Sequence, residues 1–435
     1  MSRRQDSKCM TSNTTNSTAM TGKRIDWPRN DYSRVPNWVY HDPELFGVEQ
    51  ERIFQGPTWM YVGLEAEIPN PGDFRTTYLG KAPVVFNRAR DGKIHCFVNR
   101  CAHRGALVCR KTAGNSNAHT CIYHQWTYDL TGKLIGVPFQ RGIGGQGGTS
   151  ADFKREEHGL RALRVAVYKN VIFASFSPDT LPLDEYLGST IAAHLARVMK
   201  EPLRVLGYQR QHIRGNWKLY AENVRDQYHG SLLHQFQGTF LTRTTTEGGL
   251  IMDDRHRHSI IYSTPGKDLR KDARSSDADI VHGAESFKDT RLLEFKPEFG
   301  DNRGSTICAF FPNATFQQIR NGLAVRQIRP LTPDSFDLFW TLFGYQSDSE
   351  SMTKHRLLQA NLGGPAGYIS LEDGEAIEIV QKATAGGGPS TSVVEMGGAG
   401  KIPTQVTTRM NDIAVRGFWS YYSELMDTEP PDAIR

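Results

Sequence analysis

Two short stretches of the sequence matter most: "CAHRG" at residues 101–105 and "CIYHQW" at residues 121–126. Each holds one cysteine and one histidine close together, Cys101 with His103 and Cys121 with His124. Thiolates bind zinc or iron–sulfur clusters, and imidazoles bind zinc or iron. The two stretches therefore predict one metal site built from two matching halves.

The mixed pairing favours a cluster over a zinc ion. A zinc finger tends to pair Cys with Cys and His with His, whereas a Rieske [2Fe–2S] cluster needs one of each from two loops. A mixed Cys2His2 zinc site is the alternative. Ala102, Ile122 and Tyr123 stand beside the four ligands, so no disulfide can link these two loops. Cys109 is read as a small buried hydrophobe.

The composition is that of an ordinary globular protein. The chain has 435 residues, 23% charged and 38% hydrophobic, which suits two or three domains. The net charge is +5 and the basic residues are scattered, so we expect no nucleic-acid partner. No apolar stretch is long enough for a membrane span. The six cysteines lack the spacing of a disulfide framework, which favours a reducing cytoplasm.

Changes in residue pattern divide the chain into four parts. Residues 1–23 are rich in Ser, Thr and Asn and predict a disordered tail. Residues 24–56 predict an extended segment and then a short helix from Asp42, packed on the catalytic domain. Residues 57–178 contain short β-rich runs between turn residues, which predict an all-β domain with the Cys/His pairs at loop tips.

The remaining part, residues 179–435, predicts an α+β domain with an antiparallel sheet. Asn321-Gly322 lies between two strand-like runs and predicts a hairpin with these residues in the turn. Residues 336–345 predict a third strand, and residues 411–426 an amphipathic helix. The fold class is therefore α+β.

A second candidate metal site follows Asn216, which predicts a helix cap. Trp217, Tyr220, Val224 and Tyr228 recur at helical spacing, so Asp226 and His229, three apart, would share a helix face. His229 and His234 lie five apart with Gly230 between them, where helices kink or end. Two histidines and one carboxylate form the facial triad of non-haem Fe(II) oxygenases. Asp226, Glu372, Asp373 and Glu375 are the candidates for the carboxylate, and the spacing of Asp226 suits orienting His229 instead.

The stretches "CAHRG…CIYHQW", "GNWKLYAENVRDQYHGSLLH" and "GPAGYISLEDGE" together resemble the large subunit of Rieske non-haem iron ring-hydroxylating oxygenases. The resemblance runs from about residue 34 to 426. It implies an all-β Rieske domain followed by a helix-grip domain, in which an antiparallel sheet wraps a long helix. It implies that Asp373 is the carboxylate ligand and that Asp226 bridges two subunits.

The same resemblance implies how such proteins assemble. The oxygenase is a ring, usually a trimer of large subunits, with or without a small subunit. The cluster of one subunit reaches the iron of its neighbour, so His124 of one subunit would contact Asp226 and His229 of the next.

An aromatic carboxylate is the expected substrate, with dioxygen as the second. Within the family the chain looks most like salicylate hydroxylases, terephthalate dioxygenases and ortho-substituted benzoate dioxygenases. The predicted hairpin places Gln317 opposite Arg326, with Ile319, Ala324 and Ile328 on the same face as Arg326. An arginine on an apolar face needs an anion, which a benzoate-type carboxylate would supply. Arg416 is the second candidate for binding it, and an internal ion pair is the alternative for both arginines.

Electrons must come from other proteins. Residues 142–147 match G-x-G-x-x-G but lack the strand and helix of a nucleotide fold, so they are read as a loop. NAD(P)H would act through a separate reductase, often with a ferredoxin, docked on basic residues of the β domain. A monooxygenase acting on the same substrates and a pure electron carrier are the alternative functions.

Overall fold

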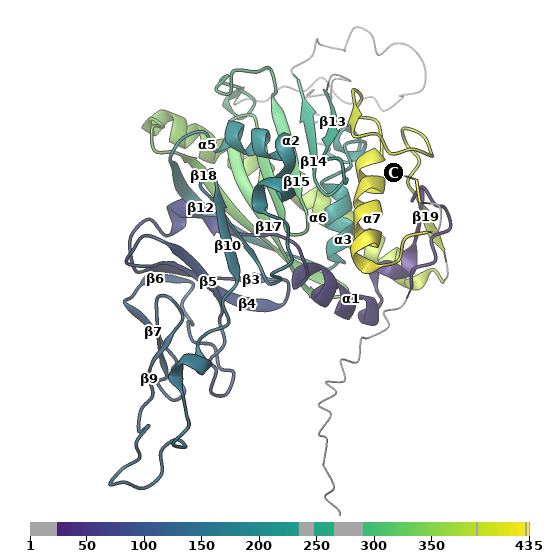
Figure 1. Ribbon diagram of the computed structural model, residues 1–435. Helices are drawn as coiled ribbons and strands as arrows, with labels where there is room; N and C mark the ends of the chain where they lie inside the picture. The colour runs from purple at the N-terminus through teal and green to yellow at the C-terminus, as the bar shows by residue number, and fades with distance from the viewer. Residues whose placement is uncertain (1–23, 235–247, 265–289, 389, 431–432, 435) are drawn as a thin grey trace, which may run out of the picture.

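The computed structural model describes residues 24–234, 248–264, 290–388, 390–430 and 433–434. The predicted tail at residues 1–23 lies outside them. Figure 1 shows a β lobe that projects from a larger body of sheet and helices, with β7 and β9 toward its far end. Within the described ranges, no helix combines the length and apolar character that crossing a membrane requires.

The β lobe contains three small antiparallel sheets. Their strand orders are β5-β4-β3-β6, β7-β8-β9 and β10-β11-β2. The strands are β2 (Met60–Leu64), β3 (Asp73–Leu79), β4 (Ala82–Arg88), β5 (Ile94–Val98), β6 (Ala113–Asn115), β7 (Ala118–Thr120), β8 (Thr127–Asp129), β9 (Leu134–Gly136), β10 (Arg164–Tyr168) and β11 (Val171–Ser175). Residues 142–147 form turns with one isolated bridge, which agrees with the predicted loop.

The body is built on one eight-stranded antiparallel sheet with the order β12-β18-β17-β16-β15-β14-β13-β20. Its strands are β12 (Leu203–Ile213), β13 (Gly248–Met252), β14 (Ser259–Ser263), β15 (Ser305–Phe310), β16 (Ala314–Ile319), β17 (Gly322–Thr332), β18 (Ser335–Tyr345) and β20 (Gln405–Val406). A separate pair joins β1 (Arg34–Pro36) to β19 (Thr391–Val393). The predicted α+β class with an antiparallel sheet is confirmed.

Helices cover both faces of this sheet. They are α1 (Pro43–Glu49), α2 (Leu183–Val198), α3 (Trp217–Asn223), α5 (Glu350–Gly363), α6 (Tyr368–Gly386) and α7 (Ile413–Met426). Short helical turns are η1 (Asn37–Tyr40), η2 (Gln50–Phe54), η3 (Glu65–Glu67), η4 (Arg155–His158), η5 (His229–Ser231) and η7 (Thr290–Leu292). The outer face, with Phe316 and Val325, packs on α2. The inner face, with Ala324 and Trp340, packs on α3 and α7.

The last helix, α7, differs from its prediction. The helix forms where the sequence predicts it, but residues 413–423 are all buried, so α7 is not amphipathic over that length. It is surrounded by the inner face of the sheet, by α3 and by the chain segment before α1. Trp419, for example, stacks edge-on against both Trp27 and Tyr40.

The hairpin of β16 and β17 also corrects a prediction. The turn residues are Arg320 and Asn321, so Ile319 pairs with Gly322 and Arg326 pairs with Thr315, not with Gln317. Arg320 takes the left-handed conformation, with φ of 53°. The buried Asn321 explains the shift, because its side chain binds the segment of Lys296 and Glu298 and its backbone N–H donates to Gln359 of α5. The predicted face is unchanged, since the shift moves each pair by two residues.

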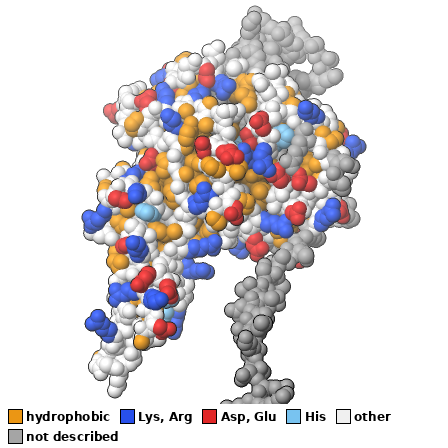
Figure 2. All heavy atoms as spheres, viewed as in Figure 1, with side chains coloured by type: hydrophobic (Ala, Val, Ile, Leu, Met, Phe, Trp, Pro, Cys, Tyr) orange, Lys and Arg blue, Asp and Glu red, His pale blue; other side chains and the backbone are white. Residues whose placement is uncertain are grey.

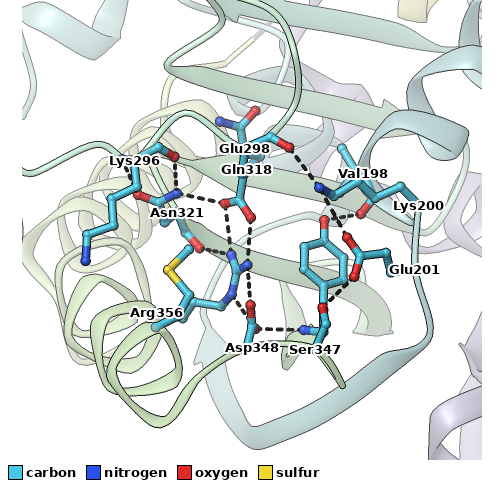
Figure 3. Close-up of polar contacts among 12 residues, drawn as sticks. Val198, Lys200, Glu201, Lys296, Glu298, Gln318, Asn321, Ser347, Asp348 and Arg356 are labelled. Carbon is cyan, nitrogen blue, oxygen red and sulfur yellow. Dashed lines mark hydrogen bonds and ion pairs between the residues drawn. The ribbon is translucent and has the colours of Figure 1, made fainter.

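A buried arginine in α5 connects this helix to the chain segment that follows β18. Arg356 lies between Glu298 and Asp348, as Figure 3 shows, with N–O distances of 2.7–3.0 Å to the two carboxylates. It also donates to the carbonyl oxygen of Asn321. Because α6 follows α5 directly, this cluster helps to set where α6 lies.

The segment before the β lobe packs on the body. Helix α1 begins where the sequence predicts, and Asp42 caps it by accepting from the Leu45 N–H. Its Glu49 is fully buried and accepts from Lys218 Nζ at 2.5 Å and from Trp217 Nε1 at 2.7 Å. Tyr422 of α7 donates to the same carboxylate at 2.7 Å. One buried charge pair thus joins α1, α3 and α7.

Candidate metal sites and substrate face

The two Cys/His loops have the same backbone fold. In each, the N–H four residues after the cysteine donates to the cysteine carbonyl: Gly105 to Cys101 and Gln125 to Cys121, both at 2.9 Å. Both donors have positive φ, 74° and 57°, which glycine adopts freely and glutamine does not. The two loops therefore present their cysteine and histidine in matching fashion.

The side chains converge as a cluster site requires. Cys101 and Cys121 are buried, and burial raises the pKa of the Cys121 thiol, with the neighbouring Cys101 adding to the effect. The rings of His103 and His124 lie 4.5 Å apart nearer the surface. Two buried sulfurs and two more exposed ring nitrogens are a donor set that would hold a [2Fe–2S] cluster.

Three aromatic side chains support these ligands: Trp126, which the sequence placed in the loop over the cluster, and Tyr123 and Tyr128, for which it predicted no such role. Trp126 stacks on His103 at 4.9 Å, and Tyr123 lies over His124 at 3.8 Å, measured between ring centroids. The Tyr128 oxygen accepts from the Ala102 N–H at 3.0 Å and lies 3.3 Å from Cys101 Sγ. The hydroxyl proton of Tyr128 is therefore free to point at the sulfur. In the sequence, this role of Tyr128 could have been indicated by its position shortly after Cys121.

In the second site, the structure brings together His229, His234 and Asp373. Their ligand atoms all lie within 4.8 Å of one another. Asp373 Oδ1 is 3.4 Å from His229 Nε2 and 3.5 Å from His234 Nε2. Two imidazoles and one carboxylate in this arrangement match the donor set of a mononuclear non-haem iron site.

Each of the three has a second partner that orients it. Asp226 Oδ2 lies 3.0 Å from His229 Nδ1, and Glu372 Oε2 lies 2.9 Å from His234 Nδ1. Asn223 donates to Asp373 Oδ1 at 3.1 Å. These partners leave both Nε2 atoms directed at the shared centre. Glu372, considered as a ligand from the sequence, acts instead on the far side of His234, and Glu375 is exposed.

The electrostatics of the triad suit a cation. Burial lowers the pKa of His229, but hydrogen bonds to Asp226 and Asp373 outweigh burial and raise this pKa to about 10. Burial raises the pKa of Asp373, and the two histidines lower it to below its usual value. The group therefore favours a positive charge at its centre, which a bound metal would supply.

The turn that carries Asp226 and His229 is not the helix that the spacing predicted. Helix α3 is capped by Asn216 as predicted but ends at Asn223. Asp226 Oδ1 accepts from the N–H of Tyr228 at 2.6 Å, which forms a side-chain-capped turn before η5. Asp226 and His229 still meet, but through this turn and not along one helix face.

Arg326 lies on the inner face of the sheet, 4% exposed. Its Nη1 donates to the Tyr220 hydroxyl at 3.0 Å, and its guanidinium lies 4.4 Å from the centroid of the Trp340 ring. Among the described residues it has no acidic partner. Arg416 has a different environment: it donates to the carbonyl oxygens of Asp31, Gly398 and Gly400. These bonds hold the segment before β1 against α7, so Arg416 has a structural role that the sequence reading did not foresee.

Both sites lie in regions that match known protein families. A model of the Rieske [2Fe-2S] domain matches residues 58–153, and a model of the ring hydroxylating alpha subunit catalytic domain matches residues 200–428. The chain belongs to the family of ring-hydroxylating oxygenase alpha subunits. It is thus an oxidoreductase whose cofactors are a Rieske cluster and a non-haem iron, with electrons supplied by a partner protein. The zinc alternative and the pure electron carrier are excluded.

Individual relatives indicate which kinds of ring-hydroxylating oxygenase the chain is similar to. The chain is 45% identical to the anthranilate 1,2-dioxygenase large subunit of Burkholderia cepacia, over 92% of this chain and 95% of that protein. It is 43% identical to a terephthalate 1,2-dioxygenase alpha subunit of a Comamonas species, over 93% and 98%. It is 42% identical to the large oxygenase component of salicylate 5-hydroxylase of a Ralstonia species, over 92% and 96%. The fold is similar to naphthalene 1,2-dioxygenase from Rhodococcus, with a TM-score of 0.75, 24% identity, and coverage of 92% and 95%.

Proposed function

We propose that this chain is the large subunit of a multicomponent oxygenase that hydroxylates aromatic carboxylates. One observation supports the substrate class above all: Arg326 is buried on the inner face of the sheet, with no acidic partner among the described residues. A buried cation without a counter-charge is costly, and a substrate carboxylate would supply that charge. The three relatives named above act on anthranilate, terephthalate and salicylate, which all carry a carboxylate.

Tyr220 connects Arg326 to the triad. Tyr220 accepts from Arg326, and Asn223, three residues further along the same helix α3, donates to Asp373 of the triad. When the carboxylate of a substrate binds Arg326, the aromatic ring of that substrate is therefore separated from the triad by Tyr220. In this arrangement Arg326 binds and Tyr220 positions the substrate.

We also propose which residues hold the two metal centres. Cys101, His103, Cys121 and His124 would hold the [2Fe–2S] cluster, which supplies single electrons. His229, His234 and Asp373 would hold the Fe(II), which supplies the activation of dioxygen. Asp226 fixes the Nδ1 proton of His229, and Glu372 fixes that of His234, so each ring offers Nε2 to the metal.

Electron transfer between subunits is the proposed role of His124 and Asp226. Both side chains are partly exposed, and Asp226 is 25% exposed while already bound to His229. Asp226 can therefore accept a second hydrogen bond from His124 of another copy. This supports a ring assembly, proposed as a homotrimer with or without a small subunit.

The electron donor is proposed to be an acidic ferredoxin or reductase that draws on NAD(P)H. Residues 57–178 carry 16 Lys and Arg residues against 8 Asp and Glu, a net charge of +8 in a chain whose total is +5. Figure 2 shows blue side chains spread over this lobe. The asymmetry favours an acidic partner. The basic residues are therefore distributed less evenly along the chain than we predicted from the sequence. The buried free cysteines suit a cytoplasmic location, which also remains a proposal.

Dioxygenation is the proposed outcome, and monooxygenation is the second candidate because of the similarity to salicylate 5-hydroxylase. Purified oxygenase with its reductase should consume oxygen when benzoates are added. Product formed under oxygen-18 gas should carry two labelled atoms for a dioxygenase and one for a monooxygenase. Substrate-independent oxygen consumption would contradict the proposal.

The substrate class is tested by Arg326→Gln. The variant should weaken binding of carboxylates about a hundredfold, because a buried charge-assisted pair contributes roughly 3 kcal/mol. The matched control is Arg329→Gln, three residues along β17, whose guanidinium lies over Tyr78 of the β lobe. Equal binding of benzoate by wild-type protein and Arg326→Gln would refute the carboxylate assignment.

A further inference from the structure

Three polar side chains face one another across neighbouring strands of the inner face. Thr315 of β16 pairs with Arg326 of β17, which pairs with Trp340 of β18. Residues directly opposite in antiparallel strands point to the same side of the sheet. All three are at least nine-tenths buried, and the bond from Arg326 to Tyr220 places them on the α3 side.

Each of them keeps a polar atom without a partner. Within the described part of the chain, Thr315 Oγ1, Arg326 Nε and Trp340 Nε1 are buried and make no hydrogen bond. The same holds for Oε1 of Gln317, two residues along β16 on the same face and 5% exposed. Buried polar atoms in folded proteins nearly always have partners. Four exceptions on the face that α3 covers indicate that a bound molecule provides the partners.

The four atoms fall into two chemical groups. Arg326 and Trp340 offer N–H donors, which suit the carboxylate of the proposed function. Gln317 Oε1 is an acceptor, and Thr315 Oγ1 is an acceptor as well as a donor. The amide nitrogen of Gln317 lies toward Gly363, where an added Cβ would be 3.5 Å away. Its cross-strand neighbour, Ala324, is small and offers no polar side-chain atom to that oxygen.

We propose that Thr315 and Gln317 are specificity residues that select aromatic acids carrying a second substituent with an N–H or O–H group. This inference rests on the proposed carboxylate function and deepens it. An amino or hydroxyl group donates to the unpaired oxygens of β16. A plain benzoate leaves both oxygens unpaired. A second carboxylate can accept from the Thr315 hydroxyl but offers no donor to Gln317 Oε1, so both acids bind more weakly.

Anaerobic binding to the purified holoenzyme tests this selection. The fluorescence of 2-aminobenzoate reports its own binding, and displacement of that probe reports 2-hydroxybenzoate, benzoate and benzene-1,4-dicarboxylate. We expect the amino and hydroxy acids to bind at least about tenfold more tightly than the other two. The double variant Thr315→Val with Gln317→Leu should bring the four acids to within about threefold of one another. The single variant Thr315→Ser, which keeps the hydroxyl, should retain most of the preference.

The controls separate this inference from the proposed function. Thr306→Val removes a buried hydroxyl, bonded to Gln318, from the opposite face of the same sheet and should leave the preference unchanged. The visible spectrum of the cluster and the iron content show that each variant is folded and loaded. If the double variant keeps the tenfold preference, or wild-type protein has none, the specificity role is wrong. If Arg326→Gln alone fails to weaken benzoate binding, the carboxylate proposal fails instead.

Discussion

The buried pair of Glu49 and Lys218 gives a prediction whose size follows from the structure. Both side chains are 0–1% exposed, and the carboxylate also accepts from Trp217 and Tyr422. Burial lowers the pKa of Lys218, against the effect of Glu49, which raises it. Lys218→Met leaves a buried carboxylate, and Glu49→Gln leaves a buried ammonium. Each should cost about 3 kcal/mol, as broken buried pairs do.

The double variant should cost much less than the sum of the two. The glutamine introduced by Glu49→Gln would still accept from a neutral donor through its amide oxygen, and methionine would fill the volume of the lysine stem. We therefore expect a loss of about 2 kcal/mol for Glu49→Gln with Lys218→Met, and a coupling of about 4 kcal/mol between the two changes.

Calorimetry at one scan rate measures these losses as shifts of Tm. At about 2–4 °C per kcal/mol, each single variant should melt about 6–12 °C lower and the double variant about 4–8 °C lower. The cluster absorbance should be the same in all four proteins before heating. Additive shifts, with the double variant near the sum of the singles, would refute the idea that the two charges are buried against each other.

Three further predictions follow from single residues. Tyr128→Phe removes a hydrogen bond to Cys101 and should lower the cluster potential by about 40–90 mV, measured by redox titration; an unchanged potential would contradict the bond. Glu372→Gln loosens His234 and should weaken iron binding roughly 10–100-fold in a chelator competition, and unchanged retention would argue against that orienting role. Burial raises the pKa of Glu222 to about 7 from its usual 4.5, although hydrogen bonds oppose the rise. The stability that protonated Glu222 contributes is full below pH 4.5 and is lost as pH rises through 7. The change in the free energy of unfolding caused by Glu222→Gln should therefore be more favourable at pH 8 than at pH 5, by at most about 2 kcal/mol because the residue is partly exposed. Equal changes at both values of pH would contradict the raised pKa.

The sequence predicts the features that depend on neighbours in the chain. The two Cys/His loops, the cap at Asn216 and the strands of the β lobe are local patterns, and the structure has all of them. His229 and His234 are close in sequence, whereas Asp373 was singled out by resemblance, because no spacing rule separates it from Glu372. The structure separates them by direction, since Asp373 points between the two Nε2 atoms and Glu372 points at Nδ1 of His234.

The errors arise where distant parts of the chain decide the outcome. Asn321 occupies its place in the hairpin turn because it binds segments near Lys296 and Gln359, which the Asn-Gly pattern cannot show. Arg416 is held by carbonyl groups from residues far away in sequence. The amphipathic reading of α7 failed because a helix packed on all sides can keep polar residues such as Ser420 and Ser423 inside.

The burial of α7 has a consequence for how the chain matures. All eight strands of the large sheet precede α7 in the chain, and the inner face of that sheet, which α3 also covers, is not fully buried until α7 packs on it. During synthesis the β lobe can close and take up its cluster early, because even its most distant strand pair, β2 with β11, is complete by Ser175. The body must wait, with an apolar surface open to the solvent, until the final helix leaves the ribosome. Chaperone demand in the cell should therefore come from this half of the molecule, and loading of the mononuclear iron should be the last step.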